Sequence, residues 1–175
     1  MDNRTIKVDK DKYKNLTSWK HFEGLLKICL IIGIMIISGF IIYYVLTPEP
    51  GYVTLGILNE DKKAENYPTG ATVNETISFY VNVGNYLNRN FSFQVQVKRG
   101  NKDTLMALNV PTNGSLDLIV GNFTLNDKEG WTSEQLNVFF LEQGENQIII
   151  VELWQIKNAK ENFYNKVYLR LNITS

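Results

Sequence analysis

The chain has 175 residues, with 18 basic and 18 acidic side chains but only one histidine and one cysteine. Since the part after residue 46 carries more acidic than basic residues, it lacks the concentrated basic face that nucleic acid requires. His21 and Cys29 both precede that part. The remainder therefore contains no Ser-His-Asp or Cys-His arrangement, no histidine-based zinc site and no disulfide.

A stretch of 19 uncharged residues, Ile28 to Leu46, predicts a membrane-spanning helix. At its usual rise such a helix is about 28 Å long, close to the ~30 Å hydrocarbon core of a bilayer. The polar stripe of a helix packed in a globular protein is missing. A cleaved secretory signal is the alternative, but it would end in a small-x-small cleavage site, whereas this stretch runs into VLTPEPGYV. We expect an uncleaved signal anchor.

The flanks of this stretch predict its orientation. Residues 1–27 form a basic tail with seven Lys or Arg and four Asp or Glu, whereas the first charge after the span is Glu49. Because positive charge stays on the cytoplasmic side, we expect a cytoplasmic N-terminus and an extracytoplasmic C-terminal domain at the plasma membrane. Cys29, at the cytoplasmic end of the span, is either an apolar helix residue or a palmitoylation site.

Residues 47–51 (TPEPG) form a linker, because two prolines and a glycine cannot continue the helix. From there the apolar pattern changes to a period of two, most clearly in Thr76–Val83, Phe91–Lys98 and Lys166–Ile173. Further strands are expected at 52–58, 104–110, 116–125, 136–141 and 147–154. Seven or eight short strands separated by turns predict an antiparallel, immunoglobulin-like β-sandwich over residues 52–175, without the Cys-Trp-Cys signature of antibody domains.

Acidic side chains are the remaining candidates for chemistry outside the membrane. Paired carboxylates catalyse glycoside hydrolysis, and oxygen ligands bind calcium. The acidic residues cluster at predicted turns, where solvated side chains are the rule; they are Glu60, Asp61, Glu65, Asp127, Glu129, Glu142 and Glu145. No phosphate-binding glycine motif is present. We therefore expect no catalytic residue, no metal and no cofactor.

Asn-x-Ser/Thr triplets are frequent in the exterior part and make candidate glycosylation sites. They begin at Asn74, Asn90, Asn113, Asn122 and Asn172. Asn3 and Asn15 also begin such triplets, but they lie on the predicted cytoplasmic side and should stay unmodified.

The segment LGILNEDKKAENYPTGATVNE, residues 55–75, resembles the opening of the exterior domain in an uncharacterised, mainly archaeal family of membrane proteins. Ala64, Glu65, Tyr67 and Pro68 match the family's AExYP core, and Asn85 stands in a turn similar to its V-x-N turn. The likeness covers residues 52–175 and implies an immunoglobulin-like domain on the outer membrane face, with no known activity. Family members carry several membrane helices where this chain has one, and the stretch 101–127 is longer here.

The AExYP loop has two interpretations. As an interaction loop it presents the Glu65 carboxylate and the Tyr67 ring to a partner. As a structural loop it packs Tyr67 on the sheet edge, fixes the turn with Pro68 and caps backbone amides with Glu65. The structural interpretation is favoured.

Three functions remain open. The first is a non-catalytic, single-span anchor whose sandwich binds another envelope component or serves as a subunit of a membrane complex; association with a second copy is also open. The second is an accessory subunit of an enzyme that handles envelope glycans or glycosylates proteins. The third, catalysis by exterior carboxylates, has the least support.

Overall fold

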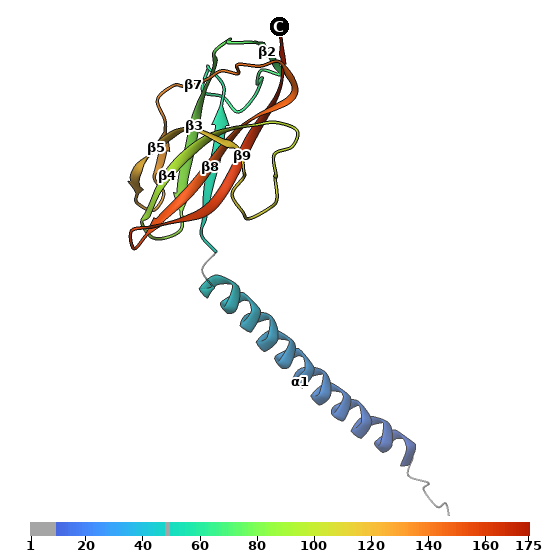
Figure 1. The fold of residues 1–175 in the computed structure, drawn as a ribbon. Coiled ribbons are helices and arrows are strands. Elements are labelled where there is room, and N and C mark those ends of the chain that lie inside the picture. The colour runs from blue at the N-terminus through green and yellow to red at the C-terminus, as the bar shows by residue number, and fades with distance from the viewer. Residues whose placement is uncertain (1–9, 48–49) are drawn as a thin grey trace, which may run out of the picture. The chain divides into compact units, whose positions relative to one another are not determined.

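The computed structural model describes residues 10–47 and 50–175, which form an N-terminal helix and a β-sandwich (Figure 1). The chain divides into two compact units, Met1–Glu49 and Pro50–Ser175. Asn3, which is expected to stay unmodified, lies outside the described residues, as do the rest of the first third of the basic tail and residues 48–49 of the linker.

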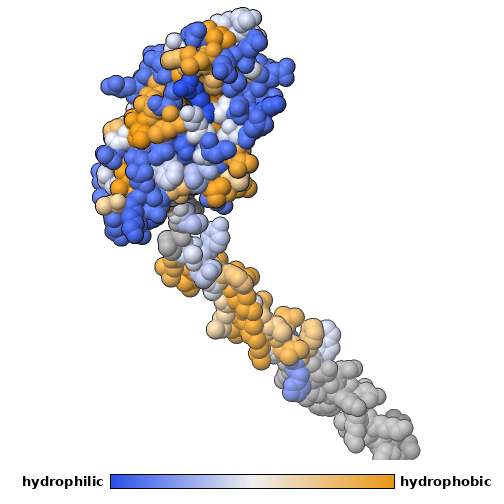
Figure 2. Space-filling model, in the orientation of Figure 1, coloured by the Kyte–Doolittle hydropathy of each residue, from blue (hydrophilic) through white to orange (hydrophobic). Residues whose placement is uncertain are grey.

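Helix α1 extends over Lys10–Leu46, so it begins well before the predicted span. Within it, His21–Leu46 is long and apolar enough to cross a membrane. The large apolar side chains of this segment are exposed, and they form the apolar stretch of the helix in Figure 2. At its end, the Thr47 amide and hydroxyl both donate to the carbonyl of Tyr43, at 2.9 and 2.7 Å. The hydroxyl thus adds a second donor to a carbonyl of the last turn of the helix.

Two sheets make up the sandwich. The smaller sheet contains β1 (Tyr52–Leu58), β3 (Ile77–Tyr86), β6 (Gly130–Thr132) and β7 (Leu136–Val138). The larger sheet has the order β2 (Gly70–Thr72), β9 (Lys160–Thr174), β8 (Gly144–Lys157), β4 (Phe91–Gly100) and β5 (Ser115–Leu125). Both β6 and β7 pair with β3, one after the other along its length.

This strand order is immunoglobulin-like, as predicted. Immunoglobulin domains place strands A, B and E in one sheet and G, F, C and C′ in the other. Here β1, β3 and the β6–β7 pair take the places of A, B and E, while β9, β8, β4 and β5 take those of G, F, C and C′. Two details differ from the prediction. The described chain has nine strands, three of them only three residues long, and β2 pairs with β9 in parallel.

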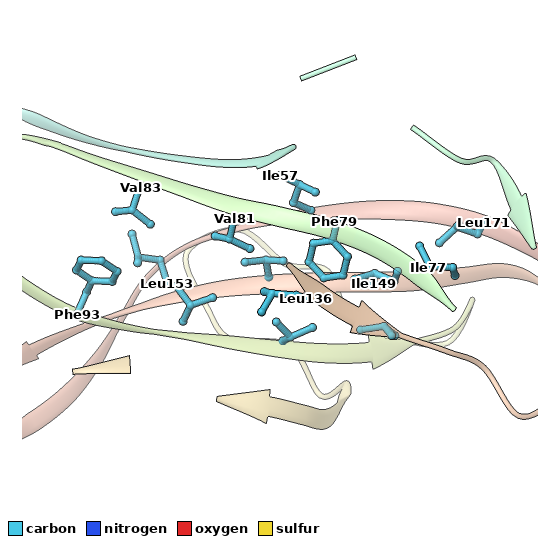
Figure 3. Packing of buried hydrophobic residues seen from close by; sticks show 14 of the residues in the cluster. Ile57, Ile77, Phe79, Val81, Val83, Phe93, Leu136, Ile149, Leu153 and Leu171 are labelled. Carbon is cyan, nitrogen blue, oxygen red and sulfur yellow. The ribbon is translucent and has the colours of Figure 1, made fainter. Parts of the chain in front are cut away.

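The core lies between the two sheets and follows the predicted alternation. In β3, Phe79, Val81 and Val83 are buried and face Ile149 and Leu153 of β8 (Figure 3). The polar residues between them point to the other face of their strand, as the period of two requires. A sandwich without disulfides is therefore held by burial of these apolar side chains.

The predicted strand Thr104–Val110 is wrong. These residues belong to a loop, residues 101–114, that crosses the face of the larger sheet turned away from the core (Figure 1). The carbonyls of Ala107 and Val110 accept hydrogen bonds from the side chain of Lys166, at 2.6 and 2.8 Å, in place of a neighbouring strand. Apolar composition alone therefore misassigned the segment.

Candidate functional site

The loop that carries the AExYP motif is organised by a residue outside the motif, Asn59. Its Oδ1 accepts the amides of Asp61 and Lys63, at 3.0 and 2.9 Å, and its Nδ2 donates to the carbonyl of Glu65, at 2.9 Å. The Glu65 carboxylate is exposed and lies 3.8 Å from the Lys63 ammonium. Thus Asn59, and not the Glu65 carboxylate, binds the amides of this loop.

Tyr67 of the same motif has a structural position. Its ring is half-buried against the core, and its hydroxyl donates to the carbonyl of Ile57, at 2.7 Å. Ala64 and Pro68 beside it are exposed. The geometry of Tyr67 favours the structural interpretation of the motif.

Asn85, which the resemblance placed in a turn, is fully buried at the end of β3. The two N–H groups of its Nδ2 lie within hydrogen-bonding distance of three carbonyls, those of Arg89, Leu125 and Asn126, at 2.7, 3.1 and 3.0 Å, so that one N–H is shared. Its Oδ1 accepts the amide of Leu87, at 3.1 Å. One side chain thus joins the β3–β4 turn to the β5–β6 turn, which makes it a structural residue.

All five candidate glycosylation asparagines of the sandwich are exposed: Asn74, Asn90, Asn113, Asn122 and Asn172. Asn122 is the extra residue of a β-bulge, because Phe93 and Gln94 of β4 pair with Phe123 and Gly121. Its φ of 65° is one that asparagine adopts more readily than most residues. Access to these side chains is compatible with modification, which stays a prediction.

The acidic candidates do not converge. Within residues 10–47 and 50–175, no three His, Cys, Asp or Glu side chains come together. Asp127 and Glu129 accept turn amides from Asn88 and Asn126, at 2.8 and 2.7 Å. The others, Glu60, Asp61, Glu65, Glu142 and Glu145, are exposed.

A buried ion pair that the sequence analysis missed lies on the outer face of the larger sheet. The Glu152 side chain in β8 is fully buried, and its carboxylate lies 2.8 Å from the ammonium of Lys98 in β4. The carboxylate also accepts the amide and hydroxyl of Thr112, at 2.6 and 2.8 Å, and the indole N–H of Trp154, at 3.1 Å. Thr112 belongs to the loop 101–114, named here the covering loop. The ion pair therefore fastens this loop to the sheet.

Electrostatics keep this carboxylate charged. Burial alone would raise the pKa of Glu152, but the hydrogen bond from Lys98 and those from Thr112 outweigh it and hold the pKa below its ordinary value. Lys98 also donates to the carbonyl of Thr112, at 3.2 Å. Buried charges are tolerated where they are paired and fully hydrogen-bonded, as they are here.

The sequence holds a weak signal of this pair. β8 reads IIIVELW, so Glu152 is the single charge in an otherwise apolar run. Lys98 closes the alternating run of β4. A lone carboxylate inside a central strand points to a buried partner, but only the register of β4 against β8 identifies it, since Gln96 lies opposite Glu152 and Lys98 lies diagonal to it.

The covering loop displays apolar side chains to solvent. Leu108 is 87% exposed and Leu105 is 68% exposed. Met106, Leu108 and Asn109 line a groove of about 200 Å³ against Phe163 and Tyr168 of β9. The exposed apolar residues of this face, named here the loop patch, are Leu105, Leu108, Val110, Leu116, Ile119 and Tyr168.

The buried ion pair and the loop patch together make a fixed, partly apolar surface. Lys166 and the Glu152–Lys98 pair fix the backbone of the covering loop at Ala107, Val110 and Thr112. The tip between these points carries the most exposed leucine of the sandwich. Such an arrangement can contact a partner without first having to order the loop.

No protein-family model and no curated protein matches the chain. Among solved structures it is similar to the crystal structure of the CARDB domain of the PF1109 protein from Pyrococcus furiosus, in complex with di-metal ions. That match has a TM-score of 0.46 and 17% identity, and it covers 74% of this chain and 93% of that one. The C-terminal domain of wzt matches with a TM-score of 0.46 and 10% identity, over 74% of this chain and 80% of that one. At these identities a likeness concerns the fold alone.

Proposed function

We propose that this protein is a single-pass, membrane-anchored β-sandwich that binds a protein partner through the loop patch, as a non-catalytic subunit of a cell-envelope membrane complex. The observation that carries the proposal is the loop patch itself. Exposed leucines are presented on a loop that a buried ion pair holds in place. Exposed apolar side chains gathered on one face are typical of protein contact sites.

The sequence supports an extracytoplasmic position for the sandwich. The seven basic residues before Ile28 favour a cytoplasmic N-terminus by the positive-inside rule. The apolar side chains of α1 are exposed, and a hydrocarbon environment would bury them. The sandwich then works outside the membrane, where a disulfide-free core suffices for a domain of this size.

The short connection between the span and the sandwich supports a membrane-bound partner. From Leu46 to Tyr52 the chain has six residues, which reach at most about 20 Å when extended. The start of β1 therefore stays within that distance of the span, which favours a partner at the bilayer. A protein that is itself embedded in the membrane satisfies this condition most simply.

The test is site-specific cross-linking in cells. A photo-reactive amino acid replaces Leu108 in the loop patch, and a control chain carries it at Thr54, exposed on β1 in the other sheet. We expect one discrete adduct with a membrane protein from position 108 and none from position 54. The adduct should disappear when Leu105→Asp and Val110→Asp are introduced together.

Two results would contradict the proposal. One is equal cross-linking from both positions, which would indicate random collision. The other is an adduct that persists in the Leu105→Asp, Val110→Asp chain. Recovery of a polytopic glycosyl-transferring enzyme as the partner would favour the accessory-subunit function, whereas recovery of surface-layer or filament proteins would favour a structural complex.

A further inference from the structure

One end of the sandwich, named here the base, comprises the start of β1 and three turns: residues 87–90, 126–129 and 157–160. Tyr52 at the start of β1 pairs with Tyr86 at the end of β3. The β5–β6 turn follows Leu125, which pairs with Phe91 at the start of β4. Phe93, near the start of β4, pairs with Gln155 of β8, and β8 ends two residues later at Lys157, where the β8–β9 turn begins. The register therefore brings all three turns to the end at which β1 begins.

The base carries two exposed, stacked tyrosines. The rings of Tyr52 and Tyr86 have centroids 5.0 Å apart and planes inclined by 25°. The two residues are 56% and 41% exposed. Tyrosine combines an apolar ring with a polar hydroxyl, and such side chains are enriched where hydrocarbon meets headgroups at a membrane surface.

Each of the three turns also presents basic side chains. Arg89, Lys128, Lys157 and Lys160 are exposed. The two acidic side chains of these turns, Asp127 and Glu129, accept backbone amides within the base. The basic groups are therefore the better placed to meet phosphate groups of lipids. Four basic against two acidic residues leave a small net charge, so the tyrosines and not anionic lipids should dominate the contact.

We propose that the base rests on the headgroup region of the bilayer, with Tyr52 and Tyr86 as its membrane contacts. This inference rests on the membrane anchoring in the proposed function. The short covalent connection to the span makes a lipid surface the occupant of the base. Tyr52 follows the last residue of the span by six positions, within about 20 Å even when the linker is extended.

The test measures depth in vesicles with the full-length chain. In a Cys29→Ser background, a single cysteine replaces Glu161 near the β8–β9 turn, and a control chain carries it at Leu141, exposed at the opposite end. Both are labelled with an environment-sensitive fluorophore in phosphatidylcholine vesicles that contain headgroup spin-labelled lipid. We expect at least threefold stronger quenching at position 161 than at 141. Position 161 lies beside the base, at the tethered end of the sandwich, so the tyrosine substitutions are needed to show that docking and not tethering brings it to the lipid.

Substitution of the tyrosines separates docking from tethering. Tyr52→Ser with Tyr86→Ser should reduce quenching at position 161 to the level at 141. The matched control, Tyr168→Ser, removes a tyrosine of similar exposure from the loop patch and should leave quenching unchanged. Circular dichroism establishes that each variant keeps its β-structure.

The outcomes separate this inference from the anchoring on which it rests. A label on native Cys29 that acyl-chain spin labels quench establishes the anchor. With that result, equal quenching at 161 and 141, or quenching at 161 that survives loss of both tyrosines, overturns the docking proposal alone. Release of the protein from the vesicles in alkaline carbonate overturns the anchor and the docking together.

Discussion

Removing one partner of the buried Glu152–Lys98 pair should destabilise the sandwich strongly. In Glu152→Gln the Lys98 ammonium loses its carboxylate while its side chain, 11% exposed, remains in the same apolar surroundings. The new amide also offers one acceptor oxygen where the carboxylate offered two, so its N–H groups face donors either at Lys98 and Trp154 or at the Thr112 amide. An uncompensated buried charge of this kind costs about 3 to 5 kcal/mol of unfolding free energy.

Replacing both partners should cost much less. Lys98→Met with Glu152→Leu removes both charges and fills the space with apolar groups, a change that is often neutral or stabilising by about 1 to 4 kcal/mol. Here the amide and hydroxyl of Thr112 and the indole N–H of Trp154 lose their acceptor, which costs about 1 to 3 kcal/mol for each of them that stays away from water. We therefore expect the double variant to be more stable than Glu152→Gln and close to the wild-type chain.

The assay is denaturant unfolding of the full-length chain in mild detergent, followed by tryptophan fluorescence. Amide hydrogen exchange over residues 101–114 reports on the covering loop separately. We expect faster exchange there in the double variant, because the anchor at Thr112 is gone although the core is intact. A cost below about 1 kcal/mol for Glu152→Gln, or unchanged exchange in the double variant, would refute the assignment of the pair as the fastening of the loop.

The pair also predicts a pH dependence. The pKa of Glu152 is lowered in the folded chain, so the pair contributes stability above the ordinary carboxyl pKa of 4.5, and this contribution is lost as the pH falls through the folded value. The wild-type chain should therefore lose more unfolding free energy than the Lys98→Met, Glu152→Leu chain between pH 5 and about 3. Equal losses in the two chains would contradict this.

Four further substitutions test single residues by the same unfolding assay. Asn85→Asp should lower the unfolding free energy by about 3 to 5 kcal/mol, because three carbonyls lose their donor and face a carboxylate. Acid should partly restore the stability by protonating this carboxylate. A loss of unfolding free energy that does not shrink on acidification would contradict this. Ala159→Gly should stabilise by about 1 kcal/mol, because Ala159 has a φ of 57° in the β8–β9 turn, and destabilisation would show that its methyl group matters more than its backbone. Tyr67→Phe should lower the unfolding free energy by about 1 kcal/mol, because the hydrogen bond to the Ile57 carbonyl is lost. Glu65→Ala, at an exposed position of the same loop, should leave it unchanged. The reverse order would show that Glu65, and not Tyr67, stabilises the loop.

Local patterns in the sequence predict most of the fold. The alternation of apolar and polar residues identifies β3, β4 and β9, because one face of each strand packs in the core. This alternation can be read from adjacent residues alone, without knowledge of the tertiary structure. The segment Thr104–Val110 defeats this reasoning. Its apolar residues resemble a strand, yet its position depends on Lys166 and Glu152, some 40 to 60 residues further on.

The candidate site was predictable to a smaller degree for the same reason. The resemblance drew attention to Asn85 and Tyr67, and both prove to be well connected, but their partners lie on other turns and strands. A buried ion pair across two strands requires their register, and Lys98 in β4 and Glu152 in β8 lie far apart in the chain. Composition gives no access to that register.

The pairing of β1 with β3 has a mechanical consequence. Seven residue pairs, Tyr52↔Tyr86 to Leu58↔Tyr80, join the strand that follows the linker to the middle of the smaller sheet. Hydrogen bonds between antiparallel strands lie perpendicular to the strand axis. Suppose that the anchor pulls on β1 through the linker while a partner holds the larger sheet. The force then acts along β1, so that these hydrogen bonds are loaded in shear and all at the same time. The strand that emerges from the anchor is thus attached in the geometry that best resists being pulled out.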